Sequence, residues 1–163
     1  MSQMDVETGY APSADGTQLL FRWHPAAEAR GLVVLIHGFG EHSGRYLHVA
    51  AALNQGGYSC FAIDLRGHGR SAGTRAFVAR FTDYLDDVDA AVGLARERCP
   101  ALPLILIGHS MGGLVVANWI EDRGDSATGF VLSSPGMGVA LAVPAWKDAL
   151  GRVMSYLIPR LAI

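Results

Sequence analysis

The strongest chemical signal in the sequence is a serine with glycines two residues before and two residues after it, in Gly108-His109-Ser110-Met111-Gly112. This G-x-S-x-G spacing is typical of a nucleophile elbow, a tight strand-to-helix turn that projects the serine hydroxyl away from a sheet. Small residues at the two flanking positions avoid clashes across the turn. The N–H groups at the start of the following helix favour negative charge at the same place. The pattern predicts that Ser110 is a catalytic nucleophile.

A second glycine-rich segment, His37-Gly38-Phe39-Gly40, directly follows the first long apolar run. Where a nucleophile elbow is present, one backbone N–H for the oxyanion comes from a loop at this place and another from the residue after the nucleophile. We therefore expect Phe39 and Met111 to form an oxyanion hole. Taken alone, the segment fits an ordinary glycine turn with a buried histidine better, but beside Ser110 the oxyanion reading is stronger. The residues expected to support the elbow and the loop are His37, Gly38, Gly108, His109 and Gly112.

The elements that must position these residues alternate between strands and helices. Continuous apolar runs, typical of strands buried on both faces, occupy Leu32–His37, Tyr58–Ile63, Leu102–Ile107 and Gly129–Leu132, and Thr17–His24 alternates as a looser strand. Helical spacing occupies Tyr46–Asn54, Phe81–Arg98 and Met111–Ile120, and Pro144 opens a further amphipathic helix. This alternation predicts an α/β fold with a mostly parallel sheet and helices on both faces.

The helix over Phe81–Arg98 is the clearest amphipathic segment. Its apolar face is formed by Leu85, Val88, Val92 and Ala95, and its N-terminal half carries Asp83, Asp86, Asp87 and Asp89. Negative charge near a helix N-terminus suits the helix dipole, and we interpret the four acids in that way.

Composition narrows the class of protein. The chain has 163 residues, of which 50% are hydrophobic and 17% charged, so we expect one globular domain and no disorder. The net charge is −2 without a basic stripe, which argues against a nucleic-acid partner. The first ten residues do not resemble a signal peptide, so we expect a cytoplasmic location, with membrane association left open. Cys60 and Cys99 have no metal or redox spacing, and a disulfide between them is the less favoured reading.

Three motifs in order give a family resemblance. The segments are His37-Gly38-Phe39-Gly40-Glu41-His42-Ser43-Gly44-Arg45-Tyr46, then Asp64-Leu65-Arg66-Gly67-His68-Gly69-Arg70-Ser71, and finally Gly108-His109-Ser110-Met111-Gly112-Gly113. Together they resemble monoacylglycerol lipases and lysophospholipase-like serine hydrolases of the α/β-hydrolase superfamily. The resemblance implies hydrolysis of lipophilic carboxylic esters such as monoacylglycerols or lysophospholipids, without a cofactor. It also implies attack by Ser110, with the oxyanion held by Phe39 and Met111.

The partners of the nucleophile are not found in the sequence. In this fold the chain order is nucleophile, acid, histidine. All six histidines precede Ser110, and none of the later acids follows a further core strand; these acids are Glu121, Asp122, Asp125 and Asp148. We expect the acid and the histidine to come from outside this chain. The main alternative is a catalytically incompetent truncated hydrolase or pseudoenzyme, and weaker ones are a base from His42 or His68, or peroxidase or acyl-transfer chemistry.

The same resemblance suggests a division of the chain. Residues 1–143 are expected to form the N-terminal part of the α/β-hydrolase core, and residues 144–163 the start of a cap or lid. Truncation after the strand that follows the nucleophile helix would leave an exposed sheet edge, for a complementary C-terminal segment or self-association to cover. The helix from Pro144 could contact acyl chains or a membrane surface, or simply pack on the core.

Two other sites are weighed and set aside. Gly67-His68-Gly69-Arg70-Ser71-Ala72 fits the glycine spacing of a dinucleotide fingerprint, but the next helix is expected to begin only near Phe81. A zinc site from His37, His42 and His48 lacks recognised ligand spacing, so no metal is expected.

Overall fold

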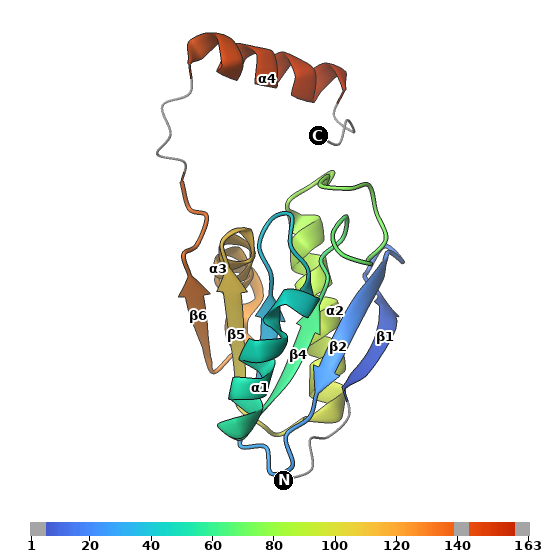
Figure 1. Cartoon of the computed structure of the whole chain (residues 1–163), viewed down its shortest axis with the longest axis vertical. Helices are drawn as coiled ribbons and strands as arrows, with labels where there is room; N and C mark the ends of the chain where they lie inside the picture. Colours follow the sequence, from blue (N-terminus) through green and yellow to red (C-terminus); the bar gives the residue numbers. More distant parts are fainter. Residues whose placement is uncertain (1–5, 139–143, 159–163) are drawn as a thin grey trace.

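The computed structural model describes residues 6–138 and 144–158, and these contain one six-stranded sheet (Figure 1). The strands are β1 (Glu7–Pro12), β2 (Gln18–His24), β3 (Gly31–Ile36), β4 (Tyr58–Ile63), β5 (Leu104–His109) and β6 (Gly129–Ser133). The helices are α1 (Leu47–Gln55), α2 (Thr82–Arg98), α3 (Met111–Arg123) and α4 (Ala145–Leu157), with short 3-10 turns at Ser43–Tyr46 and Gly124–Ser126.

The sheet has the order β1-β2-β4-β3-β5-β6. Strands β4, β3, β5 and β6 are parallel to one another. At the other edge of the sheet, β2 runs antiparallel to both of its neighbours, β4 and β1. The parallel pairing of β3 with β5 aligns Ile36 with Gly108. The carboxyl ends of the two strands therefore meet at one edge of the sheet, which brings the two glycine-rich segments together. The predicted mostly parallel α/β sheet is confirmed.

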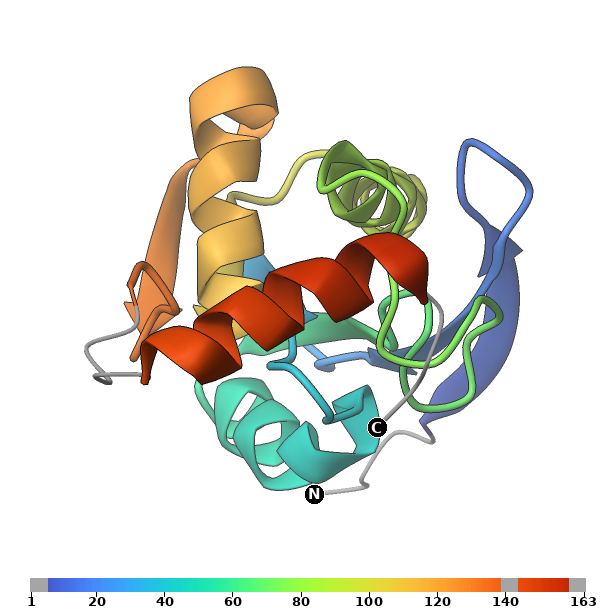
Figure 2. The same cartoon turned by 90° about the horizontal axis from the view of Figure 1, so that it is seen from above.

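Helices cover both faces of the sheet, as predicted (Figure 2). On β3, Leu32, Val34 and Ile36 are buried against α2 and α3, while Val33 and Leu35 pack toward α1. This alternation follows from the two-residue period of a strand. Both faces are apolar, which explains why the run reads as continuously hydrophobic.

Most elements lie where the sequence places them, with four differences. Helix α3 continues to Arg123, three residues beyond the predicted end. Strand β1 was missed because only Ala11 in it is buried, so it shows no alternation. Strand β5 begins after Pro103 and continues to His109, two residues beyond the predicted end. The strand predicted at Gly129–Leu132 exists as β6, but it is not buried: Phe130 and Val131 are each 50% exposed. It is the outer strand of the sheet, and within residues 6–138 and 144–158 no further strand pairs with its free edge.

Helix α4 lies beyond the carboxyl ends of the parallel strands (Figure 1). Its apolar residues recur at helical spacing and are exposed; they are Trp146, Leu150, Val153 and Leu157. None of the helices in the described part of the chain is long and apolar enough to cross a membrane. The predicted boundary at residues 143 and 144 lies at a segment, 139–143, outside the described residues.

Candidate active site

Ser110 occupies a one-residue turn between β5 and α3. Its backbone has φ 51° and ψ −116°, a conformation that non-glycine residues rarely adopt. The turn is held from β6 and the segment after it, because the N–H of Ser110 donates to the carbonyl of Ser133 at 3.0 Å and the Ser110 carbonyl accepts from Gly136 at 2.9 Å. The strand, strained serine and helix follow one another directly, which is the geometry of a nucleophile elbow.

The glycines around the elbow are required by close backbone contacts. A Cβ on Gly108 would lie 2.6 Å from the carbonyl carbon of Gly112, and one on Gly112 would lie 2.8 Å from that of Ile36 in β3. Real Cβ atoms essentially never approach so closely. The start of α3 therefore presses against β3 and β5, and the G-x-S-x-G spacing is a steric necessity of this turn.

The loop after β3 lies directly against the elbow. A Cβ on Gly38 would lie 3.2 Å from the Cβ of Ser110. The N–H of Gly38 donates to Oε2 of Glu41 at 3.1 Å, and the hydroxyl of Tyr46 donates to the same oxygen at 2.6 Å. The hydrogen bond from Tyr46 lowers the pKa of Glu41. The carboxylate thus holds the loop in a closed turn, with Phe39 at its tip, 61% exposed.

The two predicted oxyanion donors are the residues next to this contact. Met111 is the first residue of α3, so its N–H has no carbonyl one turn earlier within the helix. Phe39 follows Gly38, and Gly40 then adopts φ 69°, which reverses the loop. The structure brings the Phe39 and Met111 segments together at Ser110, at the carboxyl end of the sheet.

His37 is fully buried under this loop and both its ring nitrogens are engaged. The N–H of Leu65 donates to Nε2 at 2.9 Å, so Nδ1 carries the ring proton and donates to the carbonyl of Gly38 at 2.7 Å. Burial lowers the pKa of His37 to about 4. A neutral ring with both nitrogens occupied supports the loop and has no free lone pair for a proton from Ser110.

The other histidines near the site also have structural partners. Nδ1 of His109 lies 3.1 Å from the hydroxyl of Ser133, and Nδ1 of His68 lies 3.0 Å from the carbonyl of Arg66. Within residues 6–138 and 144–158, which include all six histidines, no histidine ring is hydrogen bonded to the Ser110 hydroxyl.

Two buried acids, whose roles sequence reasoning missed, bind the loop after β4. The first is Asp64, which accepts the N–H of Ser43 at 2.7 Å and that of Arg70 at 2.9 Å. Burial would raise the pKa of Asp64, but a hydrogen bond from the Ser43 hydroxyl and the two backbone hydrogen bonds outweigh it and lower the pKa. A Cβ on Gly69 would lie 2.5 Å from the Asp64 carboxyl carbon. The glycine therefore makes room for an internal carboxylate, a structural reason for the spacing that resembles a dinucleotide fingerprint.

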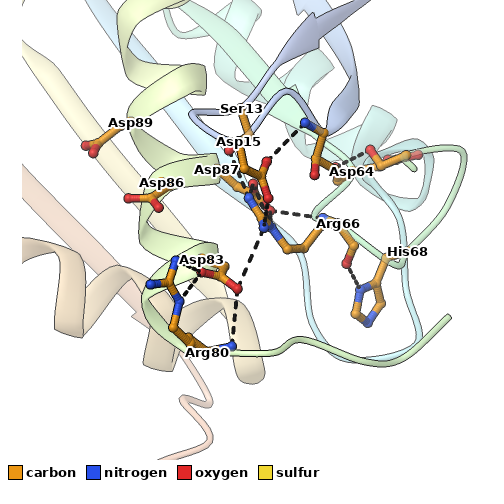
Figure 3. A network of polar contacts seen from close by, with 12 residues as sticks. Ser13, Asp15, Asp64, Arg66, His68, Arg80, Asp83, Asp86, Asp87 and Asp89 are labelled. Carbon is orange, nitrogen blue, oxygen red and sulfur yellow. Dashed lines mark hydrogen bonds and ion pairs between the residues drawn. The ribbon is translucent and has the colours of Figure 1, made fainter. Parts of the chain in front are cut away.

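The second acid is Asp87 of α2, which is fully buried. It binds the guanidinium of Arg66 through Nε at 3.0 Å and Nη2 at 2.7 Å, and it also accepts the Arg66 N–H at 3.1 Å (Figure 3). Arg66 reaches Ser13 and Asp15 in the β1–β2 turn at 3.0 and 2.8 Å. Asp87 therefore has a role that the helix-dipole interpretation did not include, because its side chain faces an arginine from a distant loop.

A parallel sheet that ends in a strained serine, with a glycine loop packed against it, defines the core of a serine α/β-hydrolase. The chain belongs to the family described as serine aminopeptidase, S33, whose sequence profile matches residues 27–163. The resemblance to monoacylglycerol lipases is confirmed. The chain is 37% identical over 141 residues to a monoacylglycerol lipase of Mycolicibacterium smegmatis, covering 86% of this chain and 50% of that one.

Two further comparisons agree with the family. The phospholipase YtpA of Bacillus subtilis is 35% identical over 133 residues, covering 81% of this chain and 51% of its own. The crystal structure of a soluble variant of monoglyceride lipase from Saccharomyces cerevisiae superposes with a TM-score of 0.80 at 26% identity, covering 100% of this chain and 57% of the other. The chain thus spans about half the length of the curated relatives it matches.

Proposed function

We propose that this chain supplies the nucleophile half of a carboxylic ester hydrolase acting on lipophilic esters. The observation that carries the proposal is the strained backbone of Ser110, held with Gly38 against it. A residue at φ 51° and ψ −116° stores conformational strain that a simple strand-to-helix turn does not need. Strain of this kind is typical of sites where a side chain must be presented to a substrate.

In the proposed reaction, Oγ of Ser110 attacks the ester carbonyl and forms a tetrahedral intermediate. The N–H groups of Phe39 and Met111 donate to the oxyanion, and the loss of one such donor typically costs about 3 kcal/mol of transition-state stabilisation. A histidine accepts the serine proton and passes it to the leaving alcohol, and an acid orients that histidine. Water then releases the acyl group from Ser110 in the same way. His37 is occupied by two hydrogen bonds, so we propose that the histidine and the acid come from a segment outside this sequence.

Monoacylglycerols or lysophospholipids are the proposed substrates. The named relatives include a monoacylglycerol lipase and a phospholipase, both of which act on lipids with acyl esters. Exposed apolar side chains near the elbow, including Phe39 at 61% and Met137 at 62%, fit an apolar acyl chain. Helix α4 adds an apolar face that is exposed in the described part of the chain, and we propose an acyl chain or a membrane surface as its contact.

A complementary strand is the proposed partner of β6. Phe130 and Val131 on this strand are half exposed, and its outer edge presents unpaired backbone groups within the described part of the chain. Such an edge favours pairing with another strand. We propose that a C-terminal segment of the family fold occupies it, and that a second copy of the chain substitutes when that segment is absent.

The test is labelling with a fluorophosphonate probe followed by intact-mass measurement. When the segment that supplies the histidine and the acid is present, wild-type protein is expected to gain one adduct and Ser110→Ala to gain none. Ser126→Ala, which changes an exposed serine outside the site, is expected to label like wild type. The same spectrum detects any co-purified polypeptide that supplies the histidine. Absence of an adduct on wild-type protein in the presence of the segment that supplies the histidine and the acid would contradict the proposal.

The second candidate is a non-catalytic protein that keeps the ester-binding elbow. It is favoured by one observation, the lack of a hydrogen bond between any described histidine and the Ser110 hydroxyl. This candidate predicts that wild-type protein binds a lipophilic ester reversibly, remains unlabelled by the probe, and releases no acid from the ester.

A further inference from the structure

His68 packs between the oxyanion loop and α2, although no step of the proposed reaction uses it. Its side chain is buried, with the ring centroid 5.6 Å from that of Phe39 in an edge-to-face arrangement at 78°. The ring also lies 5.3 Å from that of His37 and 6.4 Å from that of Tyr84 on α2. His68 therefore lies against both His37, where the loop begins, and Phe39.

One hydrogen bond sets the orientation of the His68 ring. Nδ1 lies 3.0 Å from the carbonyl of Arg66 (Figure 3). A carbonyl only accepts, so Nδ1 is the protonated nitrogen. Arg66 is itself fixed, because its N–H and its guanidinium both bind the buried carboxylate of Asp87. A continuous path of contacts thus runs from α2 through Asp87, Arg66 and His68 to Phe39.

The environment of the other ring nitrogen, Nε2, makes a histidine less favourable at this position than an apolar ring of similar size. Nε2 of His68 is buried and has no hydrogen-bond partner among the residues that the structure describes. Leaving a buried polar atom unpaired costs stability, whereas phenylalanine would fill similar space without that cost. Packing alone therefore favours an apolar ring, and the bond from Nδ1 to Arg66 is the feature that only the histidine provides.

The ring of Phe39 is held by its contact with His68. Hydrogen bonds join Gly38 and Glu41 across the turn, the N–H of each donating to the other residue at 3.1 and 3.3 Å. These bonds close the loop on either side of Phe39. The ring of Phe39 meets His68, so the angle of the Phe39 peptide depends on where that ring is held.

We propose that His68 is a positioning residue for the oxyanion loop: its Nδ1–H bond to Arg66 fixes the ring that supports Phe39 and so aims the Phe39 N–H. The role of that N–H rests on the proposed function, whereas the support of the loop does not.

Two substitutions separate the parts of this role. His68→Phe keeps a ring of similar size and removes the bond to Arg66, whereas His68→Asn keeps a short donor and removes the ring. His48→Asn, on the exposed face of α1, is the matched control. Thermal unfolding of all four proteins gives the stability against which the other measurements are compared.

Hydrogen exchange measured by mass spectrometry on peptides covering residues 37–46 tests the positioning. For His68→Phe we expect faster exchange in this segment by about threefold to tenfold, with an unchanged or higher melting temperature. A merely structural role predicts the same unchanged or higher melting temperature but slower or equal exchange, and that result overturns the proposal. His68→Asn is expected to accelerate exchange as well, and His48→Asn to match wild type.

The rate of fluorophosphonate labelling is the second readout. If wild-type Ser110 is labelled, His68→Phe is expected to lower the second-order labelling rate by about threefold to tenfold, because one oxyanion donor is misdirected. An unchanged rate together with faster loop exchange would overturn the aiming of the Phe39 N–H. If wild-type protein is not labelled even in the presence of the segment that supplies the histidine, the proposed function fails, and the exchange measurement alone decides whether His68 supports the loop.

Discussion

Arg66 and Asp87 form a buried ion pair, with Nη2 of the arginine 2.7 Å from Oδ1 of the carboxylate. The side chain of Asp87 is 0% exposed and that of Arg66 is 9% exposed. The pair joins α2 to the loop after β4, and Arg66 extends the connection to Asp15 in the β1–β2 turn. Three segments that are distant in sequence thus meet at one guanidinium, immediately beside the residues that support the oxyanion loop.

Removing the arginine should strongly destabilise the fold. Arg66→Met leaves the Asp87 carboxylate buried without a counter-charge, and breaking such a pair costs about 3–5 kcal/mol. Arg152→Met removes the exposed pair with Asp148 and is expected to cost less than about 1 kcal/mol. Urea unfolding at pH 7 measures both free energies. The double variant Arg66→Met, Asp87→Leu should recover part of the loss in stability. Equal losses in Arg66→Met and Arg152→Met would show that burial does not strengthen the effect of breaking the ion pair.

The elbow glycines should tolerate no side chain. Gly112→Ala would put a Cβ 2.8 Å from the carbonyl carbon of Ile36, a backbone atom of the central strand β3 that cannot move aside. We expect a loss of about 2–4 kcal/mol in the free energy of unfolding. The control is Gly93→Ala on α2, where nothing lies within 4 Å and the higher helix propensity of alanine should add up to about 1 kcal/mol. A Gly112→Ala protein as stable as wild type would show that α3 can move away from β3 enough to accommodate the added Cβ.

The elbow and the sheet could be predicted from sequence because their signals are local. The apolar runs of β3 and β4 and the spacing around Ser110 each lie within a few consecutive residues. Strand β1 could not be found in this way, because Glu7, Thr8 and Tyr10 leave it largely exposed and its pairing with β2 is its main determinant.

The buried acids required the tertiary structure. Asp87 stands among other acids on α2, and nothing in the local pattern distinguishes it from Asp86 and Asp89, which are not buried. Its partner lies 21 residues away in a loop, and only the packing of α2 on the sheet brings the two together. Likewise, burial of β6 was wrongly inferred from its apolar sequence, since burial depends on which elements cover the strand.

Acid should weaken the fold through His37. The pKa of His37 is lowered by burial from 6.5 to about 4, so between these values the unfolded chain binds a proton that the folded chain does not. Stability therefore rises with pH across this window, and the contribution of His37 is lost as pH falls from about 6.5 toward 4. The total effect of this group is about 3 kcal/mol.

Urea unfolding of wild type and His37→Asn at several pH values isolates this effect. The variant is expected to be less stable at pH 7, but its free energy of unfolding should fall less steeply as the pH is lowered. Within the window, the slopes of the two proteins should differ by about 1.4 kcal/mol per pH unit. Burial also lowers the pKa of His24, which contributes equally to both proteins. Parallel slopes would show that His37 is solvated or protonated in the folded state.

The outer edge of β6 should drive self-association of the isolated chain. Light scattering of purified wild-type protein is expected to show species larger than a monomer. Val131→Lys places a charge on the exposed edge strand and should shift the distribution toward the monomer. Leu47→Lys adds the same charge at a side chain of α1 that is 48% exposed, close to the 50% of Val131, and should leave association unchanged. A monodisperse wild-type monomer would argue against the edge as an interface.

Helix α4 should bind lipid surfaces through one face. Trp146, Leu150 and Val153 are 64%, 53% and 52% exposed, and they recur at the spacing of a single helical stripe. Leu150→Asp places a charge in the middle of this stripe, whereas Ser155→Asp adds the same charge on another side of the helix, near the exposed Arg152. In flotation with vesicles of zwitterionic phospholipid, Leu150→Asp is expected to lower the bound fraction severalfold, because a buried charge opposes insertion of the apolar face. Since the two variants carry the same net charge, any difference between them reports the apolar face rather than long-range electrostatics.

Equal binding by both variants would instead assign the stripe to contacts within the protein, such as a cap packed over the acyl chain at Ser110.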